Sequence, residues 1–171
     1  VGVFFLLLIL PAVNAEAKEV SLVKGDAIRY MGYSTHYYYV DGNLAFCLEP
    51  DMKSPGNGAY SASELDPKSH LSKAMYYMYG GPGYEQYIKS SLTGGWGEDA
   101  NAYCLTHCVL SYIYDGCDQN SAAFKGLNAD IASAVVMYAD YVKNLPDIPD
   151  AELAFSENGL TAYYDREQKC Q

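Results

Sequence analysis

Alternation of apolar and polar residues in the first third of the chain restricts the fold more than any other feature. Residues 20–31 alternate in this way, and residues 37–40 run directly into Asp41-Gly42, a dipeptide typical of a tight hairpin turn. Residues 43–48 then form the predicted returning strand, with Cys47 near its end. The sequence therefore predicts a β-rich N-terminal part that carries Cys47.

Four helical segments follow a predicted loop at residues 55–58. The first three end at glycine, which is common at helix C-termini, and the fourth begins with Asn128, a residue typical of N-caps. The predicted helices span residues 71–79, 84–92, 99–114 and 128–145. Because strands and helices fall in separate blocks, we expect an α+β fold in which a helical part follows the strands and a β-hairpin at residues 151–164 closes the chain.

The N-terminus carries a short apolar segment with the pattern of a signal peptide. Residues 3–10 are apolar and Val13 and Ala15 are small, while the segment is too short to span a bilayer. We expect residues 1–15 to be a signal peptide truncated at its start and residues 16–149 to form one module. Residues 150–171 are then a closing hairpin or the start of a truncated further domain. The expectation is a secreted, cell-surface chain with no membrane insertion after signal removal.

Charge and tyrosine content bear on the partners of the chain. Its 21 acidic and 11 basic residues give a net charge of -10, which disfavours a phosphate-binding surface and so nucleic acid. The 18 tyrosines are either half-buried faces of strands and helices or a contact surface for a protein or glycan. Both interpretations are compatible with an exported binding domain.

The cysteines do not form a recognisable metal or disulfide pattern. Their number, five, is odd, so in an exported chain at least one is free, modified or paired beyond this sequence. Cys104, His107 and Cys108 lack the spacing of a zinc site, and two cysteines four residues apart on a helix are poorly placed for a disulfide. We therefore predict no metal and no cofactor.

Cys47 and His107 are the two residues with the clearest chemical potential. A cysteine activated by histidine is the nucleophile of cysteine peptidases and acyltransferases, and a third group such as Glu49 or Asp115 orients the histidine. The alternative for His107 is a helix histidine satisfied by packing and hydrogen bonds. The sequence alone leaves open whether Cys47 and His107 meet.

Three segments resemble the thioester domains of Gram-positive surface adhesins. They are residues 46–50 (Phe-Cys-Leu-Glu-Pro), residues 73–84 and residues 105–107, and the resemblance extends over roughly residues 20–145. In that family a cysteine on a strand is joined to the glutamine of a Thr-Gln-x-Ala motif on a helix. The resulting internal thioester acylates an amine on a host protein and so anchors the bacterium.

This chain departs from the family pattern at the glutamine. Cys47 takes the position of the thioester cysteine, but His107 stands at the glutamine position and Val109 at the alanine position. Imidazole forms no thioester with a cysteine, so the resemblance implies a thioester-domain fold that has lost or exchanged its chemistry. Thr106 and Glu49, within the matching segments, are the candidate binding residues.

The predicted function is attachment rather than catalysis. We expect a non-covalent adhesion module at the outer end of a longer Gram-positive cell-wall protein, with stalk domains in the same chain and a host or neighbouring-cell surface protein or glycan as partner. One alternative is a covalent adhesin that reacts through Cys47, by means of a glutamine outside the motif or by disulfide exchange. The other is a Cys47/His107 peptidase or acyltransferase.

Overall fold

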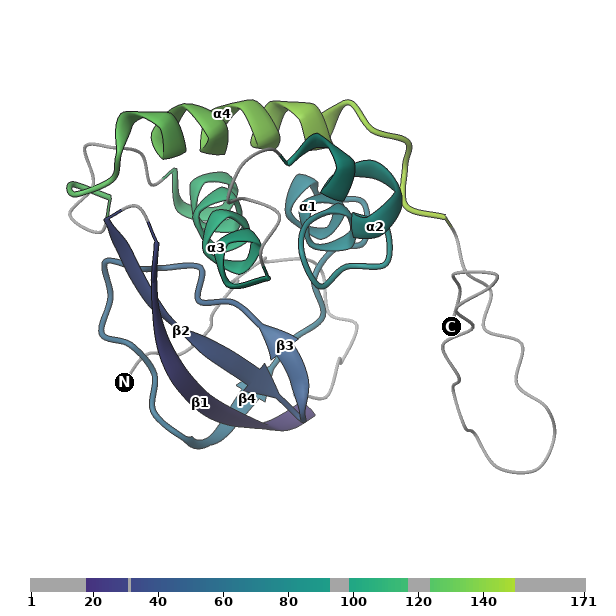
Figure 1. Ribbon diagram of the computed structural model, residues 1–171. Helices are drawn as coiled ribbons and strands as arrows, with labels where there is room; N and C mark the ends of the chain where they lie inside the picture. Colours follow the sequence, from purple (N-terminus) through teal and green to yellow (C-terminus); the bar gives the residue numbers. More distant parts are fainter. Residues whose placement is uncertain (1–17, 31, 93–98, 117–123, 150–171) are drawn as a thin grey trace, which may run out of the picture.

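The computed structural model describes residues 18–30, 32–92, 99–116 and 124–149 and confirms the α+β class (Figure 1). A four-stranded antiparallel sheet lies on one side and the helices on the other. The elements are β1 (Lys18–Tyr30), β2 (Tyr33–Val40), β3 (Asn43–Ala45), β4 (Gly58–Ala62), α1 (His70–Tyr77), α2 (Tyr84–Tyr87), the 3₁₀ turn η1 (Lys89–Ser91), α3 (Asp99–Asp115) and α4 (Ala129–Lys143). Strands thus precede helices, as the sequence predicts.

The sheet has the order β3-β2-β1-β4, and its central hairpins set the register. The turn between β2 and β3 is formed by Asp41 and Gly42, with φ of 49° and 82°. Two successive residues with positive φ are the geometry that matches the twist of a tight hairpin, so this predicted turn is confirmed. Leu22 on β1 faces Val40 on β2 across the ladder.

One strand prediction needs correction, and the structure contains a strand that the sequence does not predict. The returning strand is expected to reach residue 48, but β3 ends at Ala45. From Ala45 onward, side chains of α3 bind the backbone carbonyls in place of a neighbouring strand. The hydroxyl of Tyr103 lies 2.9 Å from the carbonyl oxygen of Ala45, and Ser111 Oγ donates to that of Cys47 at 3.2 Å. The chain beyond the predicted loop forms a further strand, β4, which pairs with the first residues of β1.

The helix boundaries follow their caps. Ser69 accepts a hydrogen bond from the backbone N–H of Ser72 at 3.0 Å at the start of α1, and Asn128 accepts one from Asp130 N at 2.7 Å, so the predicted cap of α4 is confirmed. Gly116 follows α3 with φ of 66°, as predicted for a C-terminal glycine. The second predicted helix is shorter than expected and is divided into α2 and η1.

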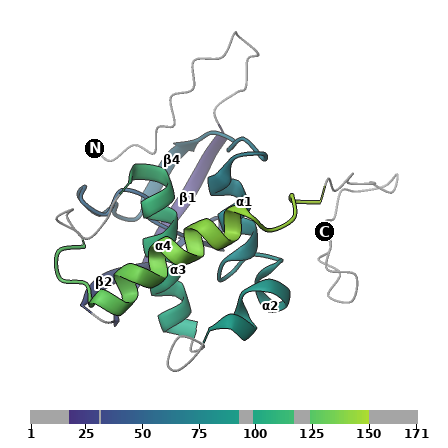
Figure 2. The same ribbon diagram turned by 90° about the horizontal axis from the view of Figure 1, so that it is seen from above.

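Helix α3 lies between the sheet and α4, with α1 at its side (Figure 2). All ten residues from 102 to 111 are buried, because one side of α3 packs on β1 and β2 and the others on α1 and α4. A helix that is covered all round shows no single apolar stripe. The centre of α3 is therefore the centre of the core, and it is the helix that carries Thr106 and His107.

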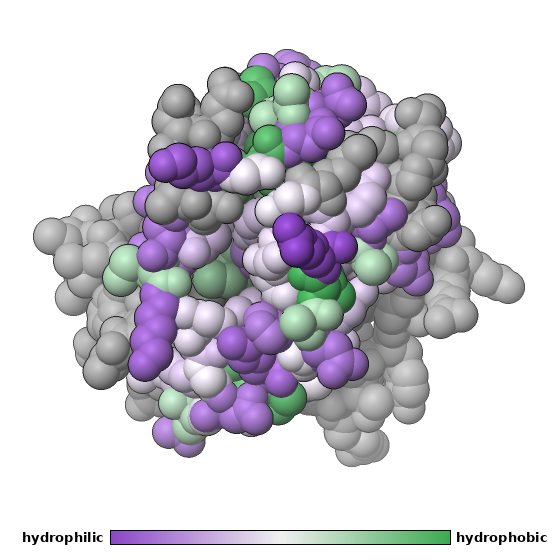
Figure 3. Space-filling model, turned by 60° about the vertical axis from the view of Figure 1, so that its left-hand side comes forward, coloured by the Kyte–Doolittle hydropathy of each residue, from purple (hydrophilic) through white to green (hydrophobic). Residues whose placement is uncertain are grey.

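The surface is mainly polar on the face shown in Figure 3, where hydrophobic residues form only small separate groups. Such scattered apolar residues are normal for a folded domain. Within the described ranges, no helix has the length and apolar character needed to cross a membrane. The predicted signal peptide, the predicted closing hairpin and two cysteines, Cys117 and Cys170, lie outside the described residues.

Candidate functional site

His107 is a buried histidine with hydrogen-bond partners at both ring nitrogens. Its side chain is 1 % exposed in the middle of α3. The hydroxyl of Tyr33 lies 2.6 Å from Nδ1, and that of Thr35 lies 3.1 Å from Nε2. Tyr33 and Thr35 are two positions apart on β2, so both side chains lie on the face of the strand that packs on α3. A neutral imidazole has one N–H and one lone pair, so it donates to one hydroxyl and accepts from the other.

The electrostatic state of His107 follows from its burial. Removal from water disfavours the imidazolium and lowers the pKa of His107 from its ordinary value of 6.5 to about 3. The phenol of Tyr33 and the hydroxyl of Thr35 carry no charge that would compensate. His107 is therefore uncharged at neutral pH and acts as a bridge between α3 and β2.

Cys47 is half-buried and lies in the stretch that follows β3, residues 46–52, which is called the Cys47 segment below. Burial raises the pKa of the Cys47 thiol above its ordinary value, and the carboxylate of Glu49 acts in the same direction. A hydrogen bond from the backbone N–H of Glu49 and the charge of Lys24 oppose this rise only in part. At neutral pH Cys47 is thus a protonated thiol rather than an activated thiolate.

The structure brings Cys47 to α3 without pairing it to His107. Both residues are described, and no hydrogen bond joins them. The link from Cys47 to α3 is instead made by its backbone carbonyl, which accepts from Ser111 Oγ one turn beyond His107. Phe46 precedes Cys47 in the chain, and its ring centroid lies 6.4 Å from that of His107.

Thr106 and Glu49, the candidate binding residues, make internal contacts. Thr106 is 1 % exposed, and its Oγ1 accepts a hydrogen bond from the backbone N–H of Tyr79 at 3.1 Å, which ties α3 to the segment after α1. The backbone carbonyl of Glu49 accepts from Met52 N at 3.0 Å in a turn that follows Cys47. The contact of Glu49 with Cys47 described above is made by its backbone N–H.

An aromatic cluster supports the Cys47 segment and was missed by sequence reasoning. Tyr103 is fully buried on α3, with Phe46 stacked on one side and Tyr37 on another, each at a ring-centroid distance of 4.7 Å. Its hydroxyl lies 2.9 Å from the carbonyl oxygens of His36 and Ala45, so it joins β2 to β3. Burial raises the pKa of the Tyr103 phenol, which keeps it protonated as a donor. The helical spacing of Tyr103 and His107 predicts that they share one face of α3, but it does not indicate that Phe46 and Tyr37 pack against Tyr103.

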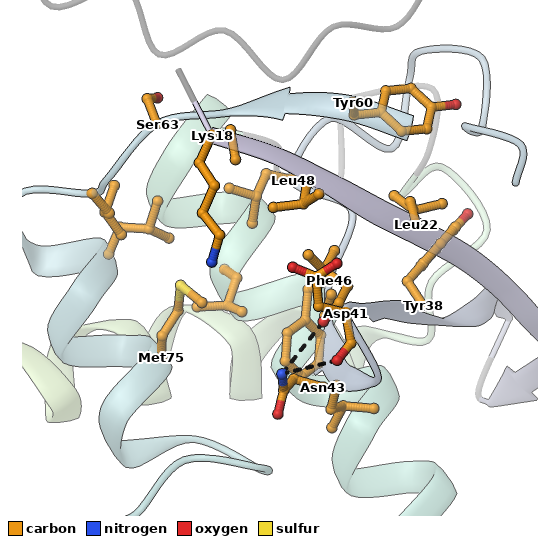
Figure 4. Close-up of a pocket in the computed structure, with 18 of the residues that line it drawn as sticks. Lys18, Leu22, Tyr38, Asp41, Asn43, Phe46, Leu48, Tyr60, Ser63 and Met75 are labelled. Carbon is orange, nitrogen blue, oxygen red and sulfur yellow. Dashed lines mark hydrogen bonds between the residues drawn. The ribbon is translucent and has the colours of Figure 1, made fainter. Parts of the chain in front are cut away.

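Residues 46 and 48, on either side of Cys47 in sequence, line a cavity of about 500 Å³ (Figure 4). The cavity lies between the strands β1 and β4 and the helices α1 and α3. Tyr38 also lines it, and its hydroxyl lies 2.6 Å from Ser54 Oγ, which accepts from Lys24 Nζ at 2.9 Å. The Cys47 segment thus has the aromatic cluster on one side and this cavity on another.

Metal binding has no support in the described part of the chain. No group of three or more His, Cys, Asp or Glu side chains there is placed to hold a metal ion. Cys104 and Cys108 are completely buried in α3, and burial raises the pKa of the Cys104 thiol to about 11. A thiol with so high a pKa is a poor ligand and a poor nucleophile at neutral pH.

Comparison with known proteins gives one match. A family model described as a thioester domain matches residues 19–149, which include every residue of the site described above. No curated protein and no solved structure matches the chain.

Proposed function

The chain belongs to the thioester-domain family, and from this premise we propose that it is a surface adhesion module of a Gram-positive bacterium that binds its partner without an internal thioester. The partner is a protein or glycan on a host or neighbouring cell. The module would stand at the outer end of a longer, wall-attached protein, in line with the signal-peptide pattern of residues 1–15.

The observation that carries this proposal is the placement of His107. By the resemblance of residues 105–107 it takes the position of the family's thioester glutamine, it has no carboxamide to lose ammonia, and both of its ring nitrogens are hydrogen-bonded to hydroxyl groups. An imidazole held in this way supplies a polar bridge inside the core. What the fold retains is an acidic scaffold suited to presenting a binding surface.

The covalent alternative rests on Cys47. Its side chain is only half-buried, and the Glu49 N–H bonded to it lies at the start of a turn. Exchange with a disulfide of the partner, which would release one partner thiol, would need a more acidic Cys47 thiol than the one observed, because exchange proceeds through the thiolate. The Cys47/His107 enzyme has less support, since no hydrogen bond links the two side chains and His107 is engaged elsewhere.

The decisive experiment compares cell attachment of the wild-type chain and its Cys47→Ser variant. Fluorescently labelled protein is incubated with cultured host cells and with bacterial cells, and bound protein is measured before and after a wash with a denaturing detergent. We expect equal binding by both proteins and complete release by the detergent. Detergent-resistant attachment that Cys47→Ser abolishes would establish the covalent alternative.

Intact mass tests the missing thioester independently of any ligand. Under non-reducing conditions we expect a mass that matches the sequence apart from disulfide hydrogens, with no uptake of methylamine. A mass lower by one ammonia, which rises by the mass of one methylamine as a single alkylatable Cys47 is exposed, would contradict the proposal.

A further inference from the structure

The cavity beside the Cys47 segment has the size of a small-molecule site. Its volume of about 500 Å³ falls in the range of roughly 300–1,000 Å³ that is usual for ligand pockets. It has walls from both layers of the fold: Val20 and Leu22 from β1, Leu71 and Met75 from α1, and Leu110 from α3. These side chains are all apolar, so the body of a matching ligand must be apolar too.

Two lining residues carry a charge, and their situations differ. The carboxylate of Asp41 accepts a hydrogen bond from the backbone N–H of Ser21 at 2.8 Å, so this acid already has a structural role. Lys18, at the start of β1, has no ion-pair partner among the described residues. Figure 4 shows its side chain extending from the strand into the cavity, on the side where Met75 lies.

An ammonium group above an apolar wall, with no ion-pair partner among the described residues, is complementary to an amphipathic anion. We propose that this cavity binds a medium-chain fatty carboxylate, with the alkyl chain between β1 and the helices α1 and α3 and the carboxylate on Lys18. The chain as a whole carries a net charge of -10 and repels anions at long range, so the local charge of Lys18 decides the polarity of the head group. This site is separate from the adhesion proposed above and does not depend on it.

Chain length and head group give two independent readouts in titration calorimetry with the full chain. For hexanoate, octanoate and decanoate, we expect affinity to rise about fourfold per methylene, because each adds about 0.8 kcal/mol of apolar burial. Decanol should bind more weakly than decanoate, by up to about fivefold, since an exposed ion pair contributes up to about 1 kcal/mol. Affinity independent of chain length, or equal affinity for decanol, would overturn the proposal.

Variants locate the site. Lys18→Ala should weaken decanoate to the level of decanol, whereas Lys125→Ala, which removes another exposed lysine, should bind like the wild type. Lys125 precedes Gly126, which lies against Gly32 at the far end of β1 from Lys18. Met75→Glu places a carboxylate in the wall at a residue that is 43 % exposed, so the fold should tolerate it while decanoate binding is lost. Unchanged binding by Lys18→Ala and Met75→Glu would show that decanoate binds elsewhere.

Discussion

At the residue scale, the hydrogen bonds of His107 explain how a histidine can be buried at the centre of the core. Its neighbours Tyr33 and Thr35 are polar but uncharged, and each uses a hydroxyl to meet one ring nitrogen. No buried side-chain polar atom of the described residues lacks a hydrogen-bond partner. The imidazole is stable in the core only while it is neutral, because the two hydroxyls could accept from both N–H groups of an imidazolium but do not replace the water that stabilises its charge.

Acidification should therefore destabilise the protein through His107. The unfolded chain protonates this histidine near its ordinary pKa of 6.5, whereas the folded state does so only near 3. Between these values the unfolded state binds more protons, so the unfolding free energy falls as pH falls, with a slope approaching about 1.4 kcal/mol per pH unit.

The measurement is chemical denaturation from pH 7.5 to pH 4.5 for the wild type and His107→Asn. Asparagine keeps a donor and an acceptor but does not titrate, and it does not recreate the glutamine of the family's thioester, so the variant should lose this part of the pH dependence. Each protein's value at pH 7.5 serves as its own baseline, which removes the cost of the substitution itself. Parallel pH profiles for the two proteins would show that His107 is protonated in the folded state as readily as in the unfolded one.

At the scale of the elements, α3 organises the segments that surround Cys47. Tyr103 lies against the end of β3, Thr106 accepts from the segment after α1, and Ser111 donates to the Cys47 carbonyl. Two of these side chains, those of Tyr103 and Ser111, thus replace the ladder hydrogen bonds where β3 ends. The conformation of the Cys47 segment depends on α3 more than on the sheet.

Ser111→Ala should loosen this segment. Ser111 is fully buried, and its loss leaves the Cys47 carbonyl without this donor, at a cost of about 1 kcal/mol. If iodoacetamide reaches Cys47 through local opening, its alkylation should become about fivefold faster. The rate at Cys47 is followed by peptide mass mapping.

A matched control for this effect is Ser133→Ala. Ser133 is an exposed serine of α4 whose Oγ donates to the carbonyl of Ala129 within the same helix, so its removal should leave the alkylation of Cys47 unchanged. A Cys47 rate that Ser111→Ala does not alter, at measurably lower stability, would mean that the hydrogen bond stabilises α3 without restraining the Cys47 segment.

Local signals account for the parts of the fold that were predicted correctly. Asp41-Gly42 defines a turn by its own backbone preferences, and Asn128 caps α4 through a bond to a residue two positions away. The early end of β3 depends on Tyr103 and Ser111, which lie about sixty residues further along the chain. Tertiary contacts at such a separation leave no periodic pattern in a single sequence.

The candidate site shows the same division. Residue type is enough to select Cys47 and His107 as candidates. The sequence does not predict that the Cys47 carbonyl binds α3, or that the His107 side chain faces β2. Its partners Tyr33 and Thr35 alternate on a strand, a pattern that marks one face of β2 without naming what lies against it. Only the packing of α3 on that face settles it.

At the scale of the whole molecule, the sheet and the helical layer meet closely at one glycine contact. Gly32, between β1 and β2, lies against the backbone of Gly126, which precedes α4. A Cβ atom on Gly32 would overlap the carbonyl oxygen of Gly126, and the φ of Gly32 is 88°. The end of the β1–β2 hairpin is thus fitted to the segment that leads into α4.

A pair of glycine substitutions measures this contact between the layers. Gly42 has a nearly equal φ of 82°, but a Cβ atom added there would meet no other atom within 4 Å, so Gly42→Ala reports backbone strain alone, about 1 kcal/mol. Gly32→Ala carries the same strain and also pushes the hairpin away from Gly126, which should add about 1–3 kcal/mol. Denaturant titration of both variants gives the difference directly. Equal losses would mean that the layers separate at this point without cost and that α4 is positioned by its contacts with α1 and α3 alone.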